Sequence, residues 1–217
     1  MIEKYLATPA IPAAASDGLI TTSELQNDVI VLLETWPYAH ENDTYQLMLN
    51  GELKGEAHQL PSPVPEVGST LTLTLAKEEL VDDGTYLVSY RATNVLGGMS
   101  ADSAATSIRV DRTRPGAALL APVIFPDAGS SDCLTGLIPG YAGMEAGDVI
   151  QTLCNGTPGP LHVVQADELT LRPIEIHFER EVIQGLAGEN VSIEYGVTDR
   201  AGNSSIMSVP VVLSGKL

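Results

Sequence analysis

Positive charge is scarce in this sequence: Lys and Arg number 11 against 28 Asp and Glu, which leaves a net charge of -17 at pH 7. Proteins that bind nucleic acid gather Lys and Arg where these side chains neutralise phosphates, and no such cluster is present. The sequence therefore predicts no nucleic-acid partner. An excess of carboxylates fits a solvated surface as well as the binding of divalent cations.

Long apolar runs are also missing. No stretch approaches the roughly 18 to 20 uninterrupted apolar residues of a membrane-spanning helix, so we expect no membrane span in this chain. Residues 1–16 lack the basic segment and the apolar stretch of a secretory signal peptide, which predicts either a piece of a longer protein or export by another signal. Their Pro and Ala spacing favours a linker or a first edge strand at residues 1–18.

Catalytic signatures are the third absence. The sequence has no Gly-rich phosphate loop, no Gly-x-Ser-x-Gly turn and no His-Glu-x-x-His helix. Its four histidines do not have the spacing of a metal or catalytic cluster. Nothing in the sequence supports an enzymatic function, and we predict a protein that is not an enzyme.

What the sequence does contain is a repeat. Residues 82–97 return in altered form at residues 187–202, and Tyr90 and Tyr195, which occupy the same place in the two copies, lie 105 positions apart. The same separation joins Asp43 to Asp148, Gln46 to Gln151, Asn50 to Asn155, Gly51 to Gly156, Thr93 to Thr198 and Gly97 to Gly202. A constant offset over separate segments predicts one module folded twice. We place the domains at residues 1–112 and 113–217, each large enough to bury its own core.

Each predicted module is built of short strands. Thr70–Leu75 reads TLTLTL, and its alternation of Leu with Thr has the period of a strand with one buried face. Asn50 and Gly51 can supply the positive φ angles of a tight hairpin. The other predicted strands lie at residues 29–34, 44–50, 52–60, 86–93, 106–110, 175–180 and 191–198. Many short strands without a long helical pattern predict an all-β fold of antiparallel β-sandwiches.

Two motifs carry a family resemblance. Asp82, Gly84 and Tyr86 form an Asp-x-Gly-x-Tyr sequence similar to the corner of immunoglobulin-like domains, in which the tyrosine hydroxyl bonds to the backbone. The Asp-x-Thr-x-Pro at residues 111–115 and the Thr-Asp-x-Ala-Gly-Asn at residues 198–203 resemble the tandem immunoglobulin-like repeats of large bacterial surface proteins and adhesins. The first unit departs from this pattern, with Asn-Val-Leu-Gly-Gly at residues 94–98 in place of the second hairpin.

The resemblance implies two tandem immunoglobulin-like sandwiches that serve as a non-catalytic stalk or binding segment of a bacterial surface or secreted protein. Its partners would be neighbouring repeats or a surface ligand, either protein or glycan. Two alternatives stay open. One is a carbohydrate-binding or substrate-binding accessory module of a larger enzyme, and the other is a component of a phage tail or injection apparatus.

Calcium is the one cofactor that the sequence suggests. In the expected topology Asp199 lies at the end of the second unit that faces the first, and Asp82, Asp83 and Asp111 lie on the opposing side. Converging carboxylates suit a Ca²⁺ ion, which takes six to eight oxygen ligands, and similar bacterial repeats use calcium to stiffen their linkers. We predict a calcium site from Asp111 and Asp199 with Asp82 or Asp83; the alternative is that these are ordinary turn residues.

The two cysteines, Cys133 and Cys154, are the only ones in the chain. Their counterparts in the first unit, residues 28 and 49, lie near the same end of two antiparallel strands, so a bond between the cysteines is geometrically reasonable. We predict a Cys133–Cys154 disulfide, which implies an oxidising compartment; the alternative is a pair of buried thiols.

One aromatic segment is a candidate ligand-binding site. Trp36, Tyr38 and His40 follow the predicted strand at residues 29–34, in a loop expected beside residues 94–98. A sugar or a protein ligand could stack on these side chains. The alternative is a tryptophan that plugs the end of the core or contacts a preceding domain.

Overall fold

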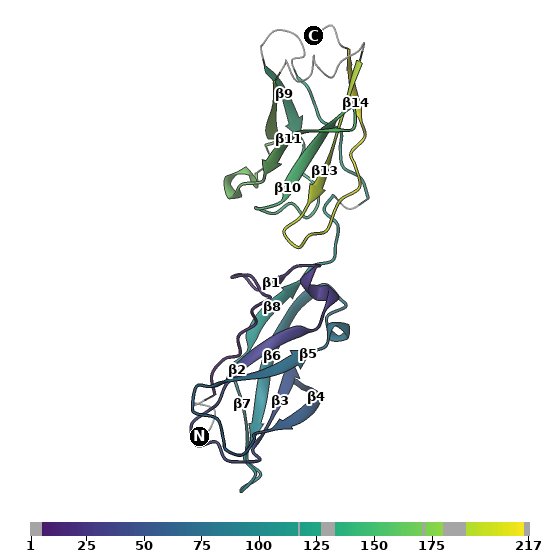
Figure 1. Cartoon of the computed structure of the whole chain (residues 1–217). Helices are drawn as coiled ribbons and strands as arrows, with labels where there is room; N and C mark the ends of the chain where they lie inside the picture. The colour runs from purple at the N-terminus through teal and green to yellow at the C-terminus, as the bar shows by residue number, and fades with distance from the viewer. Residues whose placement is uncertain (1–5, 117, 127–132, 171, 180–189, 215–217) are drawn as a thin grey trace. The chain divides into compact units, whose positions relative to one another are not determined.

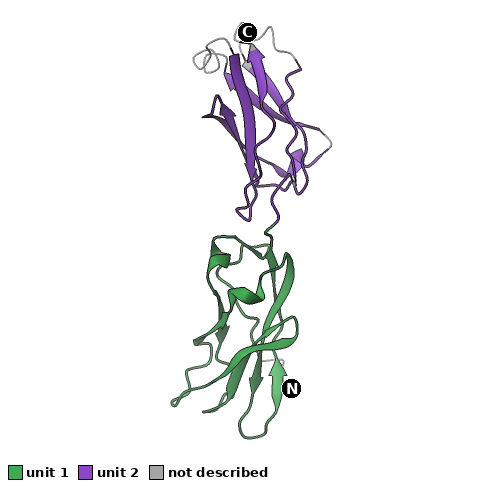
Figure 2. Ribbon diagram, turned by 90° about the vertical axis from the view of Figure 1, so that its right-hand side faces the viewer, with its two compact units in different colours: residues 1–112 green, residues 113–217 purple. Residues whose placement is uncertain are grey.

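The computed structural model describes residues 6–116, 118–126, 133–170, 172–179 and 190–214. It divides the chain into two compact units, residues 1–112 and residues 113–217 (Figure 2). Strands form most of the ordered structure in both units, and the helices among the described residues are 3-10 helices of three residues at Glu24–Gln26, Lys77–Glu79 and Ala166–Glu168.

Unit 1, residues 1–112, consists of two sheets with a core between them. The larger sheet has the order β1 (Leu19–Ile20), β8 (Thr106–Val110), β6 (Gly84–Thr93), β3 (Thr44–Leu49) and β4 (Glu52–Gln59), with β7 (Ser100–Asp102) also paired to β6. The smaller sheet pairs β2 (Val29–Glu34) with β5 (Thr70–Leu75). All neighbouring strands are antiparallel except β1 and β8, which are parallel. Figure 1 shows β2 and β5 in front of the sheet that contains β8, β6 and β3.

Alternation along the strands builds this core. In β5 the predicted inward residues Leu73 and Leu75 are buried and Leu71 is partly buried, while the threonines that alternate with them are exposed. In the larger sheet, strand β6 contributes the buried side chains of Val88 and Tyr90 to the core. Full burial of an aliphatic or aromatic side chain contributes about 1.5 to 3 kcal/mol, so each pair of facing strands adds substantially to the stability of the sandwich.

Two local predictions are confirmed in unit 1. The hairpin between β3 and β4 turns at Asn50 and Gly51, whose φ angles of 52° and 84° are the positive values that such a tight turn requires. At the corner before β6, the hydroxyl of Tyr86 donates a hydrogen bond to the carbonyl oxygen of Asp82 at 2.9 Å. Each unit is an antiparallel β-sandwich of the immunoglobulin-like type, as predicted.

Unit 2, residues 113–217, has the same two-layer construction (Figure 1). Its larger sheet has the order β11 (Thr157–Val163), β10 (Val149–Cys154), β13 (Asn190–Thr198) and β14 (Val211–Ser214), and its smaller sheet pairs β12 (Ile174–Glu179) with β9 (Cys133–Ile138). Phe178 of β12 and Tyr195 of β13 are among the largest fully buried side chains. The Tyr195 hydroxyl donates to the carbonyl oxygen of Ala121 at 2.9 Å, which anchors the segment before β9 to the core.

The two units repeat individual hydrogen bonds at the same offset as the sequence. Oδ1 of Asn50 accepts from the backbone N–H of Leu87 at 2.9 Å, and Oδ1 of Asn155 accepts from that of Ser192 at 2.8 Å. The backbone N–H of Tyr90 donates to the Ser103 hydroxyl at 3.1 Å. The corresponding bond from Tyr195 to the Ser208 hydroxyl measures 3.0 Å. The Asn and Ser pairs of the repeat therefore make the same backbone contacts in both units.

The first strand is where the units differ. In unit 1, Ala10 bridges to Leu32 of β2, and the chain then forms β1 beside β8. In unit 2, Ile124 bridges to Leu137 of β9. The bridged residues are 22 positions apart in unit 1 and 13 apart in unit 2, and the described part of unit 2 has no strand equivalent to β1.

Candidate binding site at the loop end of unit 1

Three loops lie at one end of unit 1, which we call the loop end: residues 35–43 between β2 and β3, residues 60–69 between β4 and β5, and residues 94–99 between β6 and β7. They share this end because their flanking strands are antiparallel neighbours. Backbone hydrogen bonds connect them, from Leu60 N–H to the Asp43 carbonyl at 2.8 Å and from Gly68 N–H to the Thr35 carbonyl at 2.9 Å.

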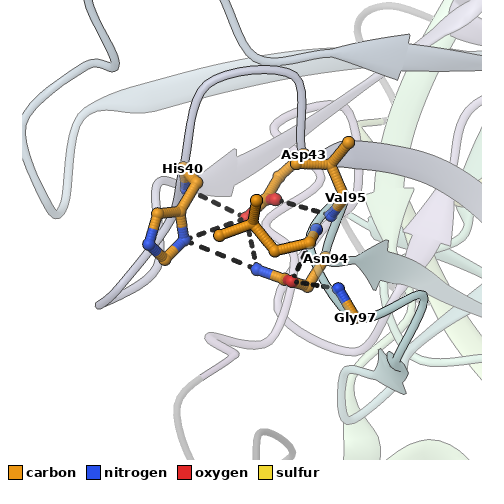
Figure 3. Close-up of polar contacts among 6 residues, drawn as sticks. His40, Asp43, Asn94, Val95 and Gly97 are labelled. Carbon is orange, nitrogen blue, oxygen red and sulfur yellow. Dashed lines mark hydrogen bonds and ion pairs between the residues drawn. The ribbon is translucent and has the colours of Figure 1, made fainter.

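Asp43 fastens the first loop to the third. Its side chain is only 1% exposed, and Oδ2 accepts a hydrogen bond from the backbone N–H of His40 at 2.9 Å. Oδ1 accepts one from the backbone N–H of Val95 at 2.9 Å. Figure 3 shows the carboxylate between the two loops, with the Asn94 side chain next to it. A buried carboxylate that accepts hydrogen bonds from backbone N–H groups of both loops holds these loops in one arrangement.

Asn94 fixes the shape of the third loop. Its side-chain oxygen accepts hydrogen bonds from the backbone N–H groups of Leu96 and Gly97, both at 3.0 Å (Figure 3). The Gly98 N–H bonds to the Asn94 carbonyl and the Asn94 N–H to the Met99 carbonyl, each at 2.9 Å. An asparagine that bonds to the backbone two and three residues on stabilises a tight turn, so this loop has little freedom to rearrange.

These loops expose several large apolar side chains. Tyr38 in the first loop is 80% exposed and Leu96 in the third is 78% exposed. Single exposed apolar residues are normal on a protein surface, but a group of them on ordered loops is typical of an interaction site. The further exposed members of the group are Val67, Val95 and Met99.

For Trp36 the structure shows the stated alternative to a ligand-binding role. Trp36 is 5% exposed and packs edge-on against Tyr45, with ring centroids 6.4 Å apart. It plugs the end of the core, so its ring is not presented to a ligand. Tyr38 and His40 do reach solvent, and the His40 ring nitrogen Nδ1 lies 3.9 Å from the Asp43 carboxylate.

Unit 2 has the same framework at the equivalent end. Asp148, the counterpart of Asp43, is fully buried, and its Oδ2 accepts from the backbone N–H of Glu145 at 3.0 Å and from the Tyr141 hydroxyl at 2.8 Å. Its Oδ1 is buried without a hydrogen-bond partner. Burial raises the pKa of Asp148, and the nearby Asp199 and Glu145 add to the rise, while the two hydrogen bonds oppose it.

The chemistry of the two loop ends is different even though the framework is shared. At the 105-residue offset, the apolar residues of unit 1 are replaced by polar or small ones in unit 2. The pairs are Tyr38 and Gly143, Val95 and Arg200, Leu96 and Ala201, and Met99 and Ser204. Ala201 is buried, whereas Leu96 is exposed. Among the described residues of the equivalent unit 2 loops, Leu169 is the exposed large apolar side chain, so the apolar residues at positions 38, 95, 96 and 99 are specific to unit 1.

The residues predicted to bind calcium have structural roles within their own units. The Asp82 carbonyl accepts from Tyr86, and Oδ1 of Asp83 accepts from the backbone N–H of Arg112. Both carboxylate oxygens of Asp199 accept from Asn203, at 2.8 and 2.9 Å. Among the described residues, no three His, Cys, Asp or Glu side chains are grouped to hold a metal ion. Because the predicted site with Asp111 draws on both units, it stays a prediction.

The predicted disulfide also stays a prediction. Cys154 ends β10 with its side chain buried, and that burial raises the pKa of its thiol. Cys133 begins β9, and its side chain lies outside the described residues.

In the part of the chain that the structure describes, no helix has the length and apolarity needed to cross a membrane.

Sequence reasoning missed the residues that matter most at the loop end. It used Asn94 only as a departure from a family motif, and it named neither Leu96 nor Met99 as a candidate. The available signal was the comparison of the two repeats, in which an apolar Val-Leu pair stands where the second copy has Arg-Ala.

No protein-family model matches this chain, and no curated protein matches it in sequence. Among solved structures, it is similar to a chain of a 1.5-MDa bacterial ice-binding adhesin, with 17% identity and a TM-score of 0.49 over 95% of this chain. This chain spans 63% of the length of the adhesin chain. It is also similar to the fibronectin(III)-like modules of CbhA from Clostridium thermocellum, with 15% identity and a TM-score of 0.42 over 94% of this chain and 90% of that one.

Proposed function

We propose that this chain is a non-catalytic adhesive module of a bacterial surface or secreted protein, and that unit 1 binds a ligand through its loop end. One observation carries the proposal: a buried aspartate organises the loops of both units, but the exposed apolar residues Tyr38, Val95, Leu96 and Met99 of unit 1 have polar or small counterparts in unit 2. Shared residues keep the sandwich folded. The residues that differ are those that a ligand would contact.

The order of the loops supports binding in energetic terms. Association loses free energy when flexible side chains and loops become ordered at the interface. In unit 1 the Asp43 and Asn94 hydrogen bonds have already ordered the backbone before any ligand arrives. Burying an exposed apolar side chain then contributes about 25 cal/mol per Å² of apolar surface, with little opposing cost from the backbone.

A loop exchange tests this proposal. Cells that display the chain are compared with cells on which residues 95–99 carry the unit 2 sequence of residues 200–204. Adhesion is measured to surfaces coated with a panel of purified extracellular proteins and to a glycan array. We expect at least a tenfold loss of adhesion to one class of surface, because central apolar contacts dominate most interfaces. Equal adhesion of the two displays would contradict an adhesive role for the loop end.

A matched control separates loss of the apolar group from loss of apolar surface in general. Leu96→Ser with Met99→Ser removes two exposed apolar side chains from the loop end. Val81→Ser with Val212→Ser removes two from elsewhere, since both of these residues are exposed and neither belongs to the three loops. Only the first pair is expected to reduce adhesion. A glycan signal that depends on Tyr38 would favour the carbohydrate-binding alternative.

A spacer is the second candidate, and the polar loops of unit 2 favour it for that unit. A spacer requires a stable sandwich but no exposed recognition group, and this describes the end of unit 2 that carries Asp148 and residues 199–204. Under a pure spacer function, the loop exchange leaves adhesion unchanged in every assay. Replacement of both units by an unrelated sandwich of similar length would then preserve adhesion as well.

A further inference from the structure

The charges around the loop end narrow the kind of ligand that it can take. The three loops at residues 35–43, 60–69 and 94–99 contain no Lys or Arg. Their exposed charged residues are Glu41 and Glu66. The nearest strand cation in the sequence, Arg91 of β6, donates to both carboxylate oxygens of Asp102, at 2.6 and 2.8 Å. Besides these two carboxylates the loops expose the ring of His40, so the permanent charges that the loops themselves carry at their surface are negative.

We propose that the ligand of the loop end is a protein surface that combines apolar side chains with Lys or Arg. This inference rests on the proposed function and specifies its partner. Apolar side chains of the ligand would bury Tyr38 and Leu96, the two most exposed members of the group. Cations of the ligand would lie near Glu41 and Glu66 at the rim, where complementary charge mainly raises the association rate and selects the partner.

Other occupants fit these charges less well. Nucleic acid and anionic lipid surfaces need cations on the protein, and the loop end has none. A second copy of this chain would bring together two molecules that each carry a charge of -17, and such like charges repel at moderate salt. A protein that carries both apolar and basic side chains meets both features of the site.

The strength of the charge contribution depends on salt. Both glutamates are exposed, so their interactions act over roughly the Debye length, which is about 10 Å at 0.1 M ionic strength and about 3 Å at 1 M. Association should therefore slow several-fold as salt is raised. Dissociation, which depends on the buried apolar contacts, should change much less.

A peptide array tests the inference with defined probes. One family of 12-residue peptides combines Leu and Phe with Lys and Arg, a second combines Leu and Phe with Asp and Glu, and a third combines Ser and Gly with Lys and Arg. The labelled full chain is applied beside the Leu96→Ser/Met99→Ser variant, which keeps the net charge. Only binding that this variant loses is counted, so non-specific attraction of basic peptides to an acidic protein does not contribute.

We expect loop-dependent binding to the first family alone, at least tenfold above the other two. Glu41→Gln with Glu66→Gln should slow association several-fold at 0.05 M salt and remove most of its salt dependence. The matched variant Glu56→Gln/Glu175→Gln changes two exposed glutamates outside the loop end and removes the same number of negative charges. Its rate of loop-dependent association should stay within about twofold of the parent rate.

The possible failures are distinguishable. Loop-dependent binding to the acidic family, or equal effects of the two glutamate pairs, would overturn the inference and leave the proposed function standing. Loop-dependent dimerisation in sedimentation experiments would assign the loop end to a second copy and would also overturn it. If no peptide, protein or glycan binds in a loop-dependent way, both the inference and the proposed function are wrong.

Discussion

Asp148 stands 105 residues after Asp43 and is buried as completely, but only Asp43 has a hydrogen-bond partner for both of its carboxylate oxygens. In unit 1 the second oxygen accepts from the loop at residues 94–99. In unit 2 the equivalent oxygen, Oδ1 of Asp148, has no partner. The same residue at the same position is therefore hydrogen-bonded through both oxygens in unit 1 and through one in unit 2.

The first prediction concerns Asp43→Asn. Because both oxygens accept backbone N–H groups, an amide in either orientation would place its NH₂ group against one of these donors. Unmet buried polar groups cost about 1 to 3 kcal/mol, and we expect the free energy of unfolding of unit 1 to fall by about that amount. Fluorescence of Trp36 during urea denaturation measures it, since the only tryptophan of the chain is buried in unit 1. An unchanged midpoint would show that the carboxylate does not hold the loops.

The second prediction concerns Asp148→Asn. The pKa of Asp148 is raised above the ordinary value of 3.8, so its contribution to stability is fully present below pH 3.8 and is lost as the pH rises through the folded-state pKa. An uncharged Asn removes this loss. We expect the variant to be more stable than the parent at pH 7, by up to about 1 kcal/mol, and the difference to vanish toward pH 3.5.

Amide NMR signals of β10 during denaturation at several pH values measure this second effect, because they report on unit 2 alone. Other carboxylates have their own pH dependence, such as Glu168, whose pKa is lowered by hydrogen bonds from Gln165 and His162 against the effect of burial. The difference between variant and parent cancels those contributions. A difference that stays constant with pH would mean that Asp148 is not the titrating group.

The third prediction tests the corner of unit 1. Tyr86→Phe removes the hydroxyl that donates to the Asp82 carbonyl and keeps the ring in place. A typical hydrogen bond contributes about 0.5 to 1.5 kcal/mol net, and we expect the Trp36 transition to shift by that amount. Unit 2 has Val191 at this position and serves as the internal control, since its transition should not move.

The fourth prediction concerns Trp36 itself. At 5% exposure, with its ring against Tyr45, its fluorescence should be blue-shifted and poorly quenched by acrylamide, and Trp36→Ala should destabilise unit 1 by about 3 to 5 kcal/mol. Quenching close to that of free tryptophan would instead return this side chain to the candidate ligand site.

Local patterns predicted the fold well because each reflects a local physical requirement. The Thr and Leu alternation at residues 70–75 can bury one face only as a strand, and Asn50–Gly51 is suited to the positive φ angles that it adopts. The sequence leaves the burial of Trp36 as one of two alternatives, because the residues that contact it, such as Tyr45, come from a distant part of the chain. Nor does the sequence around Leu19 show that this segment pairs in parallel with β8.

The loop end illustrates the same limit for the candidate site. Tyr38 and His40 were predicted from their residue types and are exposed, but the group depends equally on Leu96, which composition alone does not single out. That the loops carrying Leu96 and Tyr38 meet follows from the Asp43 to Val95 hydrogen bond, which joins residues more than 50 positions apart. Such long-range contacts carry no periodic signal in a single sequence.

The last prediction tests whether the loop is ordered before it binds. Asn94→Ala removes the acceptor for the N–H groups of Leu96 and Gly97 but keeps every exposed apolar side chain. We expect hydrogen exchange at these two amides to accelerate at least tenfold, while the stability of unit 1 changes by about 1 kcal/mol or less, because opening would be confined to the loop. Binding to the apolar and basic peptides should weaken, since the ligand must then order the loop.

Ser103→Ala, which removes a hydroxyl bonded to Tyr90, is the control: it should lower stability without faster exchange at Leu96. If exchange at Leu96 is already fast in the parent, the apolar group is not presented by an ordered loop, and the energetic reason for placing the binding site there is lost.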